Sequence, residues 1–416
     1  MNLASVVRAE QKLLLPTYDR HKVLFTHGRG VYLWDSKGKR YLDFVSGIGV
    51  NALGHAHPAV LKVLRQQAAK MIHSSNLFYH PYQAELAKRL TKISGLDRVF
   101  FCNSGTEAWE GALKLARAYA RAENRNGNKA KWRLLALDNS FHGRTFGALA
   151  TTGQQKYRDP FVPLLPGVEF VAFNDLEDLQ RQFDESVCAI CLETIQGEGG
   201  IHPISPEFLA LARELADRSG ALVLLDEIQC GLGRTGEYFA FQHYGIKPDI
   251  VTVAKPLAAG LPLGAVLTTE RVSGGMHPGL HGTTFGGGPL ACRVAIEYLR
   301  QLEGLLGHIR QLGKYFLGEL ERLHSKHSVV RAVRGIGFML AIELESTDAA
   351  KQVVSRLLAQ GILINRTHET VLRFLPPYIT KAKHVDALIA ALDPELSALS
   401  SAPKSPSKSG RTKVAA

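Results

Sequence analysis

An aspartate and a lysine each stand at the end of an apolar segment. Asp226 closes the segment Ala221–Asp226, and Lys255 follows Ile250–Ala254. Continuous apolar runs predict buried strands, and open α/β sheets bind ligands beyond the carboxyl ends of their strands. A pyridoxal cofactor needs both side chains, since a lysine holds its aldehyde and an acid keeps its ring nitrogen protonated. A structural ion pair would use the same residues, and spacing alone leaves the two interpretations about equal.

A glycine-containing segment predicts a phosphate site. The expected strand Arg98–Phe101 leads into Cys102–Glu107 and then into an amphipathic helix. Ser104 and Glu107 have the spacing of a capping box, and Gly105 lets a ligand approach the backbone. The free amides of a helix N-terminus suit a dianion. Many such helix starts are simple turns, so this segment supports a phosphate site only in combination with Asp226 and Lys255.

Two loop segments carry further candidates. Asn139–Arg144 offers the Phe141 ring for stacking and the Arg144 guanidinium for a carboxylate, although composition alone favours an ordinary loop with an exposed arginine. Glu193–Gly200 follows an apolar run and contains two acids. Arg373 is a lone charge within an apolar segment and therefore needs a partner, for which a structural salt bridge is the simplest explanation.

The order of predicted elements indicates an α/β protein. We expect strands at Arg98–Phe101, Arg133–Leu137, Val168–Ala172, Cys188–Glu193, Ala221–Asp226, Ile250–Ala254 and Gly264–Thr268, with helices such as Pro206–Ser219 between them. A hairpin at 31–44 and a C-terminal series predict a second, smaller unit. That series is a helix near 305–325, a strand Gly337–Glu343, a helix 348–360, strands Ile362–Asn365 and Val371–Leu375, and a helix 381–392. The predicted division is an arm and hairpin at 1–58, a large domain at 59–304, the rest of the small domain at 305–396, and a disordered basic tail at 397–416.

Composition limits the function classes. The 416 residues are 45% hydrophobic and carry a net charge of +12, and no apolar run reaches membrane-spanning length. We expect a cytoplasmic enzyme that binds anionic small molecules, with no membrane or nucleic-acid partner, because basic and aromatic residues are not interleaved. Cys188 and Cys191 have CxxC spacing, but an odd offset in a strand predicts opposite faces, and we expect no metal.

Taken together, these segments resemble the class III (subgroup II) aminotransferases of pyridoxal-phosphate (PLP) fold type I, and most of all the acetylornithine aminotransferase branch. The resemblance extends from about Thr17 to Leu392 and rests on six segments: Asp43–Pro58, Ser75–Tyr79, Asn103–Ala108, Phe141–Thr145, Leu225–Gly236 and His281–Gly287. It implies a large domain with a mostly parallel seven-stranded sheet and a smaller α+β domain built from both chain ends.

The resemblance also implies residues that bind PLP. Lys255 would be the Schiff-base lysine and proton shuttle, and Asp226 would pair with the pyridine nitrogen. The remaining implied contacts are Gln229 to the 3′ oxygen, Phe141 stacked on the ring, Gly105 and Thr106 on the phosphate, and Thr284 reaching the phosphate of the partner subunit in a homodimer with shared sites.

Substrate roles follow by the same resemblance. Arg144 would take the carboxylate of acetylornithine and Arg373 the α-carboxylate of glutamate. Glu198 would mask Arg373 while the other substrate binds, with Thr283 and Glu193 beside them. The implied reaction moves the δ-amino group of N2-acetyl-L-ornithine to 2-oxoglutarate, a step of arginine biosynthesis.

Other functions stay open. The amino donor could instead be 4-aminobutyrate, ornithine, succinylornithine, succinyldiaminopimelate or a lysine-pathway donor on an acidic carrier protein. An aminomutase or decarboxylase of the same fold is a rival that stoichiometric consumption of 2-oxoglutarate would exclude. A nucleic-acid-binding protein that uses the +12 charge is a rival from outside enzymology.

Overall fold

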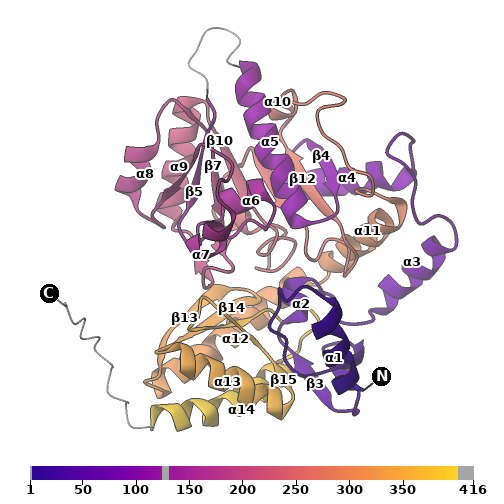
Figure 1. Ribbon diagram of the computed structural model, residues 1–416, viewed down its shortest axis with the longest axis vertical. Coiled ribbons are helices and arrows are strands. Elements are labelled where there is room, and N and C mark those ends of the chain that lie inside the picture. The colour runs from indigo at the N-terminus through magenta and orange to yellow at the C-terminus, as the bar shows by residue number, and fades with distance from the viewer. Residues whose placement is uncertain (1, 124–130, 402–416) are drawn as a thin grey trace.

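A seven-stranded sheet forms the centre of the larger unit of the computed structural model, which describes residues 2–123 and 131–401 (Figure 1). Its strands in spatial order are β4 (Arg98–Cys102), β12 (Gly264–Thr268), β11 (Ile250–Val253), β10 (Leu222–Asp226), β7 (Val187–Glu193), β5 (Arg133–Leu137) and β6 (Val168–Val171). Only β12 runs antiparallel to its two neighbours; the other pairs are parallel. The predicted mostly parallel sheet of seven strands is confirmed, with strand ends shifted by one residue at most.

Helices cover both faces of this sheet, which explains why its strands read as continuous apolar runs. Alternate residues of β10 enter two different apolar clusters, with Leu224 on one side and Leu225 on the other. Helix α5 (Gly105–Glu123) packs its apolar stripe on the first side, and α9 (Pro206–Ser219) packs on the second.

Further helices and short strands complete the larger unit and its flank (Figure 1). They are α3 (Pro58–Ala68), α4 (Pro81–Ser94), α6 (Phe146–Ala150), α7 (Gln155–Arg158), α8 (Leu176–Gln182), α10 (Glu270–Ser273) and α11 (Pro289–Glu303), the 3-10 helices Asp159–Phe161 and Ala240–His243, and the strands β8 (Ile195–Gln196) and β9 (His202–Pro203).

Both ends of the chain build the smaller unit, which lies below the large sheet in Figure 1. One sheet joins β1 (Phe25–Arg29), β2 (Tyr32–Asp35) and β3 (Arg40–Asp43) to β15 (Ile362–Leu363), and β3 and β15 run parallel. The other sheet is antiparallel, with the order β13 (Val330–Ile336), β14 (Met339–Leu344), β17 (Val371–Phe374) and β16 (Asn365–Thr367). Its helices are α1 (Leu3–Leu13), α2 (Ser46–Gly49), α12 (Leu306–Lys326), α13 (Thr347–Gln360) and α14 (Ala382–Ser400).

The structure corrects several local predictions. The hairpin β2–β3 is confirmed, but β1 and β13 were not expected. The single strand predicted at Ile362–Asn365 is two strands in different sheets. Helix α14 continues to Ser400, so the first residues of the predicted disordered tail are helical, while residues 402–416 lie outside the described residues.

The two cysteines of the CxxC segment share one face of β7, which contradicts the sequence prediction. Both belong to the apolar cluster under α5, because the pairing of β5 with β7 shifts register between Arg133 and Leu134 and places an extra residue in β7. Burial raises the pKa of Cys188 to about 11. Within the described chain, no group of three potential metal-ligating side chains occurs, and no helix is long and apolar enough to cross a bilayer.

Candidate active site

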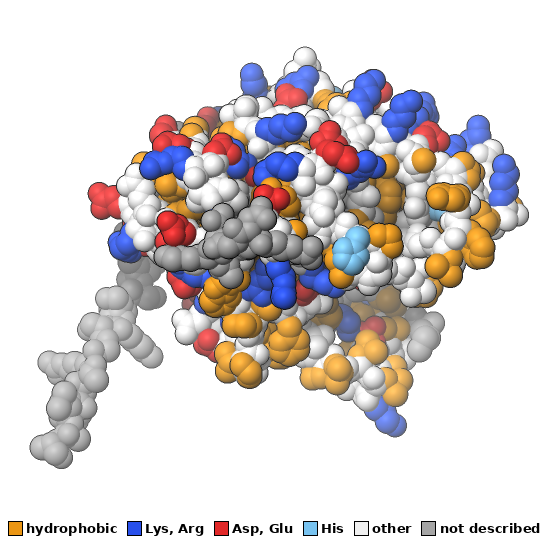
Figure 2. Space-filling view, turned by 90° about the horizontal axis from the view of Figure 1, so that it is seen from above, with side chains coloured by type: hydrophobic (Ala, Val, Ile, Leu, Met, Phe, Trp, Pro, Cys, Tyr) orange, Lys and Arg blue, Asp and Glu red, His pale blue; other side chains and the backbone are white. Residues whose placement is uncertain are grey.

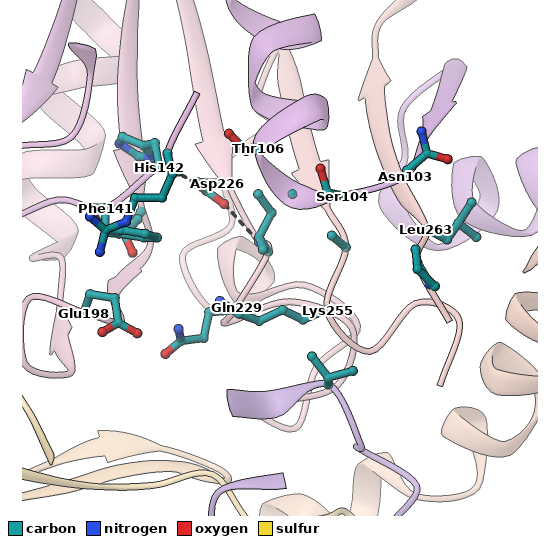
Figure 3. Close-up of a pocket in the computed structure, with 18 of the residues that line it drawn as sticks. Asn103, Ser104, Thr106, Phe141, His142, Glu198, Asp226, Gln229, Lys255 and Leu263 are labelled. Carbon is teal, nitrogen blue, oxygen red and sulfur yellow. Dashed lines mark hydrogen bonds and ion pairs between the residues drawn. The ribbon is translucent and has the colours of Figure 1, made fainter. Parts of the chain in front are cut away.

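A cavity of about 420 Å³ opens at the carboxyl ends of the central strands and collects most of the predicted site (Figure 3). Nine of the twelve predicted residues line it: Gly105, Thr106, Phe141, Arg144, Glu193, Glu198, Asp226, Gln229 and Lys255. Arg373 lies directly behind, against Glu198 and Gln229. Thr283 reaches the lining only through Asn103, which donates a hydrogen bond to its hydroxyl at 3.1 Å, and Thr284 is exposed on the same loop away from the cavity of its own chain.

Asp226 and Lys255 face the same cavity without forming an ion pair. The carboxylate of Asp226 instead contacts His142 Nδ1 at 2.8 Å and accepts a hydrogen bond from the Ile228 amide at 3.1 Å. Desolvation in the cavity lowers the pKa of Lys255, and the positive charge of Arg373 lowers it further. A lysine with a lowered pKa loses its proton more readily and becomes a better nucleophile. The geometry therefore does not support a structural ion pair between these two residues.

The first turn of α5 forms one wall of the cavity. Ser104, Gly105 and Thr106 line it there, and the Ser104 hydroxyl accepts a hydrogen bond from the Glu107 amide, as in an N-cap. A Cβ atom on residue 105 would lie 2.9 Å from the Ile228 side chain. Glycine therefore lets the helix start approach the loop after β10 without displacing Ile228, and the free amides of this helix start suit an anion.

Glu193 is a buried acid at the end of β7. Its two carboxylate oxygens accept hydrogen bonds from the Phe141 amide at 2.9 Å and from the Gly197 amide at 3.1 Å. Burial, reinforced by the nearby charge of Asp226, raises the pKa of Glu193 to about 8. Glu193 is therefore largely protonated and uncharged at neutral pH, and it fixes the loop that carries Phe141.

Arg373 on β17 is almost inaccessible, at 1% exposure, and is neutralised by one acid. Its Nη1 lies 2.6 Å from Glu198 Oε1, and the same nitrogen donates to Gln229 Oε1 at 3.1 Å. Although burial opposes ionisation, Arg373 holds the pKa of Glu198 below its usual value. The Glu198 side chain keeps 27% of its surface exposed, in contrast to the buried arginine that it neutralises.

Arg144 has a different environment. It is exposed at the rim of the cavity and, within the described residues, has no carboxylate partner. Its guanidinium carbon lies over the Tyr157 ring at 4.0 Å and over the Phe141 ring at 5.4 Å. The cavity therefore lies between one arginine that is already paired and one that is free to bind an anion.

His142 is the main residue of the site that the sequence motifs did not single out. Its ring is buried, contacts Asp226 and stacks on Trp109 with centroids 4.0 Å apart and planes within 7° (Figure 3 shows His142 beside Asp226). Its Nε2 has no hydrogen-bond partner among the described residues. The only sequence signal was its position next to Phe141, since Asp226 is 84 residues away.

The chain matches the family described as Aminotransferase class-III over residues 16–396. The chain belongs to the class-III aminotransferases. An acetylornithine aminotransferase of Methanocaldococcus jannaschii is 46% identical over 94% of this chain and 98% of its own length.

Solved structures agree with this assignment. An ornithine aminotransferase of Toxoplasma gondii, described with partial occupancy of PLP at its active site, superposes with a TM-score of 0.90 at 32% identity, over 95% of this chain and 94% of its own. An acetylornithine aminotransferase of Elizabethkingia anophelis gives a TM-score of 0.84 at 30% identity, over 96% of this chain and all of its own.

The cavity of this aminotransferase fits PLP, the cofactor of the family. The start of α5 suits the phosphate, Phe141 offers a ring beside it, and Asp226 carries a carboxylate that His142 orients. Lys255 can hold the cofactor covalently. When bound, PLP accepts the electron pair of the bond that breaks at the amine-bearing carbon.

Proposed function

We propose that this aminotransferase takes N2-acetyl-L-ornithine as its amino donor and 2-oxoglutarate as its acceptor, in arginine biosynthesis. The observation that carries the proposal is the contrast between the two arginines, with Arg373 paired to Glu198 and Arg144 unpaired at the rim. The identity to curated acetylornithine aminotransferases supports it.

The two substrates need different charges beside the reacting carbon. Glutamate carries its carboxylate there, so it requires a bare Arg373, and Glu198 must move aside. Acetylornithine has a CH₂ group there, which is stabilised when Glu198 neutralises Arg373, while its distant carboxylate binds Arg144. Lys255 then removes a proton from the amine-bearing carbon of the donor in the first half-reaction, and it delivers a proton to the carbon that becomes the α-carbon of glutamate in the second. Gln229, which contacts Arg373 and lines the cavity, links the cofactor site to this switch.

Steady-state kinetics with a panel of ω-amines test the donor most directly. We expect kcat/KM to be at least tenfold higher for N-acetylornithine than for ornithine, 4-aminobutyrate or putrescine, because only the first has a carboxylate at the right distance and an uncharged α-nitrogen. A higher kcat/KM for ornithine or 4-aminobutyrate would reject the proposal while leaving the aminotransferase assignment intact.

The same proposal includes a homodimer with shared active sites. Large apolar side chains are exposed around the loop that carries Thr284, including Leu77 at 86%, Phe78 at 72% and Phe285 at 67% exposure. Asn76 joins the two segments through a 3.1 Å hydrogen bond to the Thr283 carbonyl. An exposed apolar patch of this kind suits a protein interface, and a second copy would let Thr284 reach the partner's cofactor phosphate.

Subunit mixing tests the shared site. Lys255→Ala removes the nucleophile of one chain, and Thr284→Asp places a negative charge against the partner's phosphate. If sites are shared, mixed dimers regain one intact site, so random mixing restores about a quarter of wild-type activity. No recovery from mixtures whose subunits have exchanged would contradict the role of Thr284. The cytoplasmic location stays a prediction.

A further inference from the structure

Tyr157 on the short helix α7 makes a contact with Arg144 that no predicted role explains. The guanidinium carbon of Arg144 lies 4.0 Å from the centre of the Tyr157 ring, the shortest contact of its type in the described residues. The Phe141 and Tyr157 rings stand edge to face, with centroids 6.1 Å apart at 82°. The two rings therefore form a corner that confines the guanidinium.

From this corner we infer that Tyr157 is a specificity-determining residue, which positions Arg144 for the carboxylate of the amino donor. A ring attracts the face of a guanidinium and leaves its N–H donors free, whereas a carboxylate partner would occupy those donors and cancel the charge. Arg144 thus keeps its full positive charge and its bidentate fork for the substrate. This inference rests on the proposed function, because it assumes that Arg144 binds the donor carboxylate.

The contrast with Arg373 supports this role. Arg373 is buried, and its nitrogens bond to Glu198, Gln229 and Asn365. Arg144 is exposed and would otherwise sample many rotamers, and ordering such a side chain on substrate binding costs free energy. The Tyr157 ring reduces this cost because it orders Arg144 before the substrate binds. Loss of the ring should therefore weaken binding of a carboxylate-bearing donor and leave the chemical step unchanged.

The aromatic ring matters rather than the hydroxyl, which has no hydrogen bond within the described chain. Tyr157→Phe therefore keeps the contact and serves as the conservative variant. Tyr157→Leu and Tyr157→Met remove the aromatic face and retain apolar bulk. Lys156→Met is the matched control, since Lys156 also lies over the Tyr157 ring, at 5.3 Å, but does not line the cavity.

Kinetics with two donors test the inference in the PLP-loaded enzyme. We expect Tyr157→Leu to raise KM for N-acetylornithine roughly three- to tenfold, as the loss of a cation–π contact implies, with kcat within about twofold. The parameters for putrescine, which has no carboxylate, should not change. Tyr157→Phe and Lys156→Met should match the wild type with both donors.

A binding measurement separates specificity from folding. The dissociation constant of N-acetylnorvaline, which keeps the carboxylate but lacks the reacting amine, should rise by the same factor in Tyr157→Leu or, if that variant folds poorly, in Tyr157→Met. An unchanged KM and dissociation constant, or equal effects on both donors, would overturn the inference. Arg144→Ala shows which of the two proposals fails. If Arg144→Ala loses the preference for N-acetylornithine over putrescine and the Tyr157 variants keep it, only the role of Tyr157 is rejected. If Arg144→Ala also keeps this preference, the proposed carboxylate site itself is rejected.

Discussion

Replacing Glu198 by glutamine should shift the enzyme's preference from the ω-amine toward glutamate. Glutamine keeps the shape and one acceptor near Arg373 but removes the negative charge that now lies 2.6 Å from Nη1. A charge-assisted hydrogen bond contributes about 1–1.5 kcal/mol more than a neutral one. Because each 1.4 kcal/mol is a tenfold change, kcat/KM for N-acetylornithine should fall about five- to tenfold relative to that for glutamate.

The two half-reactions can be followed separately by single-turnover absorbance of the bound cofactor. Glu198→Gln should slow the half-reaction with N-acetylornithine and leave the glutamate half-reaction equal or faster, since no acid then competes for Arg373. Thr367→Val is the control, because it removes the hydrogen bonds from the Thr367 hydroxyl to the Glu198 backbone carbonyl at 2.8 Å and to Glu198 Oε2 at 3.3 Å but leaves the charge in place. The ratio should therefore change less than twofold. Equal losses in both half-reactions would show that Glu198 supports only the local structure and would refute the switch.

Two further substitutions test the interior of the site. His142→Phe keeps a ring on Trp109 but removes the hydrogen bond to Asp226, so the dissociation constant of PLP, measured by absorbance, should rise about 5- to 30-fold; a change below twofold would contradict the positioning role. Glu193→Gln removes an acid whose pKa of about 8 in the folded protein lies above its value in the unfolded chain. The folded wild type therefore keeps a proton that the unfolded chain has lost, and its free energy of unfolding should fall as the pH rises to about 8, whereas that of the variant should not show this loss. Thermal melting of both holoenzymes at pH 6 and pH 9 measures this difference. Between these two pH values the wild type should lose roughly 2 kcal/mol more stability than the variant, and an identical pH dependence of the two proteins would exclude a protonated Glu193.

The sequence was sufficient for features that depend on local pattern. The buried strands that precede the Asp226 carboxylate and Lys255 and the helix start at Gly105 were predicted within one residue, because apolar runs and capping residues act within one element. The parallel register of β10 and β11 then brings the two strand ends to the same edge.

Features that depend on register between distant segments could not be predicted. The contact of His142 with Asp226 joins the loop after β5 to the end of β10, and these segments meet only when β5, β7 and β10 are aligned. The shared face of Cys188 and Cys191 depends on a register shift against β5, which composition does not reveal. The contact of Arg144 with Tyr157 likewise requires the chain to turn back after α6.

Borohydride reduction of the holoenzyme followed by peptide mass spectrometry tests directly whether Lys255 holds the cofactor. We predict that the pyridoxyl mass is found on the peptide that contains Lys255 and is absent from the Lys255→Ala protein, which should also have lost transamination. A label on another lysine, or full activity in Lys255→Ala, would show that Lys255 is not the residue that holds the cofactor.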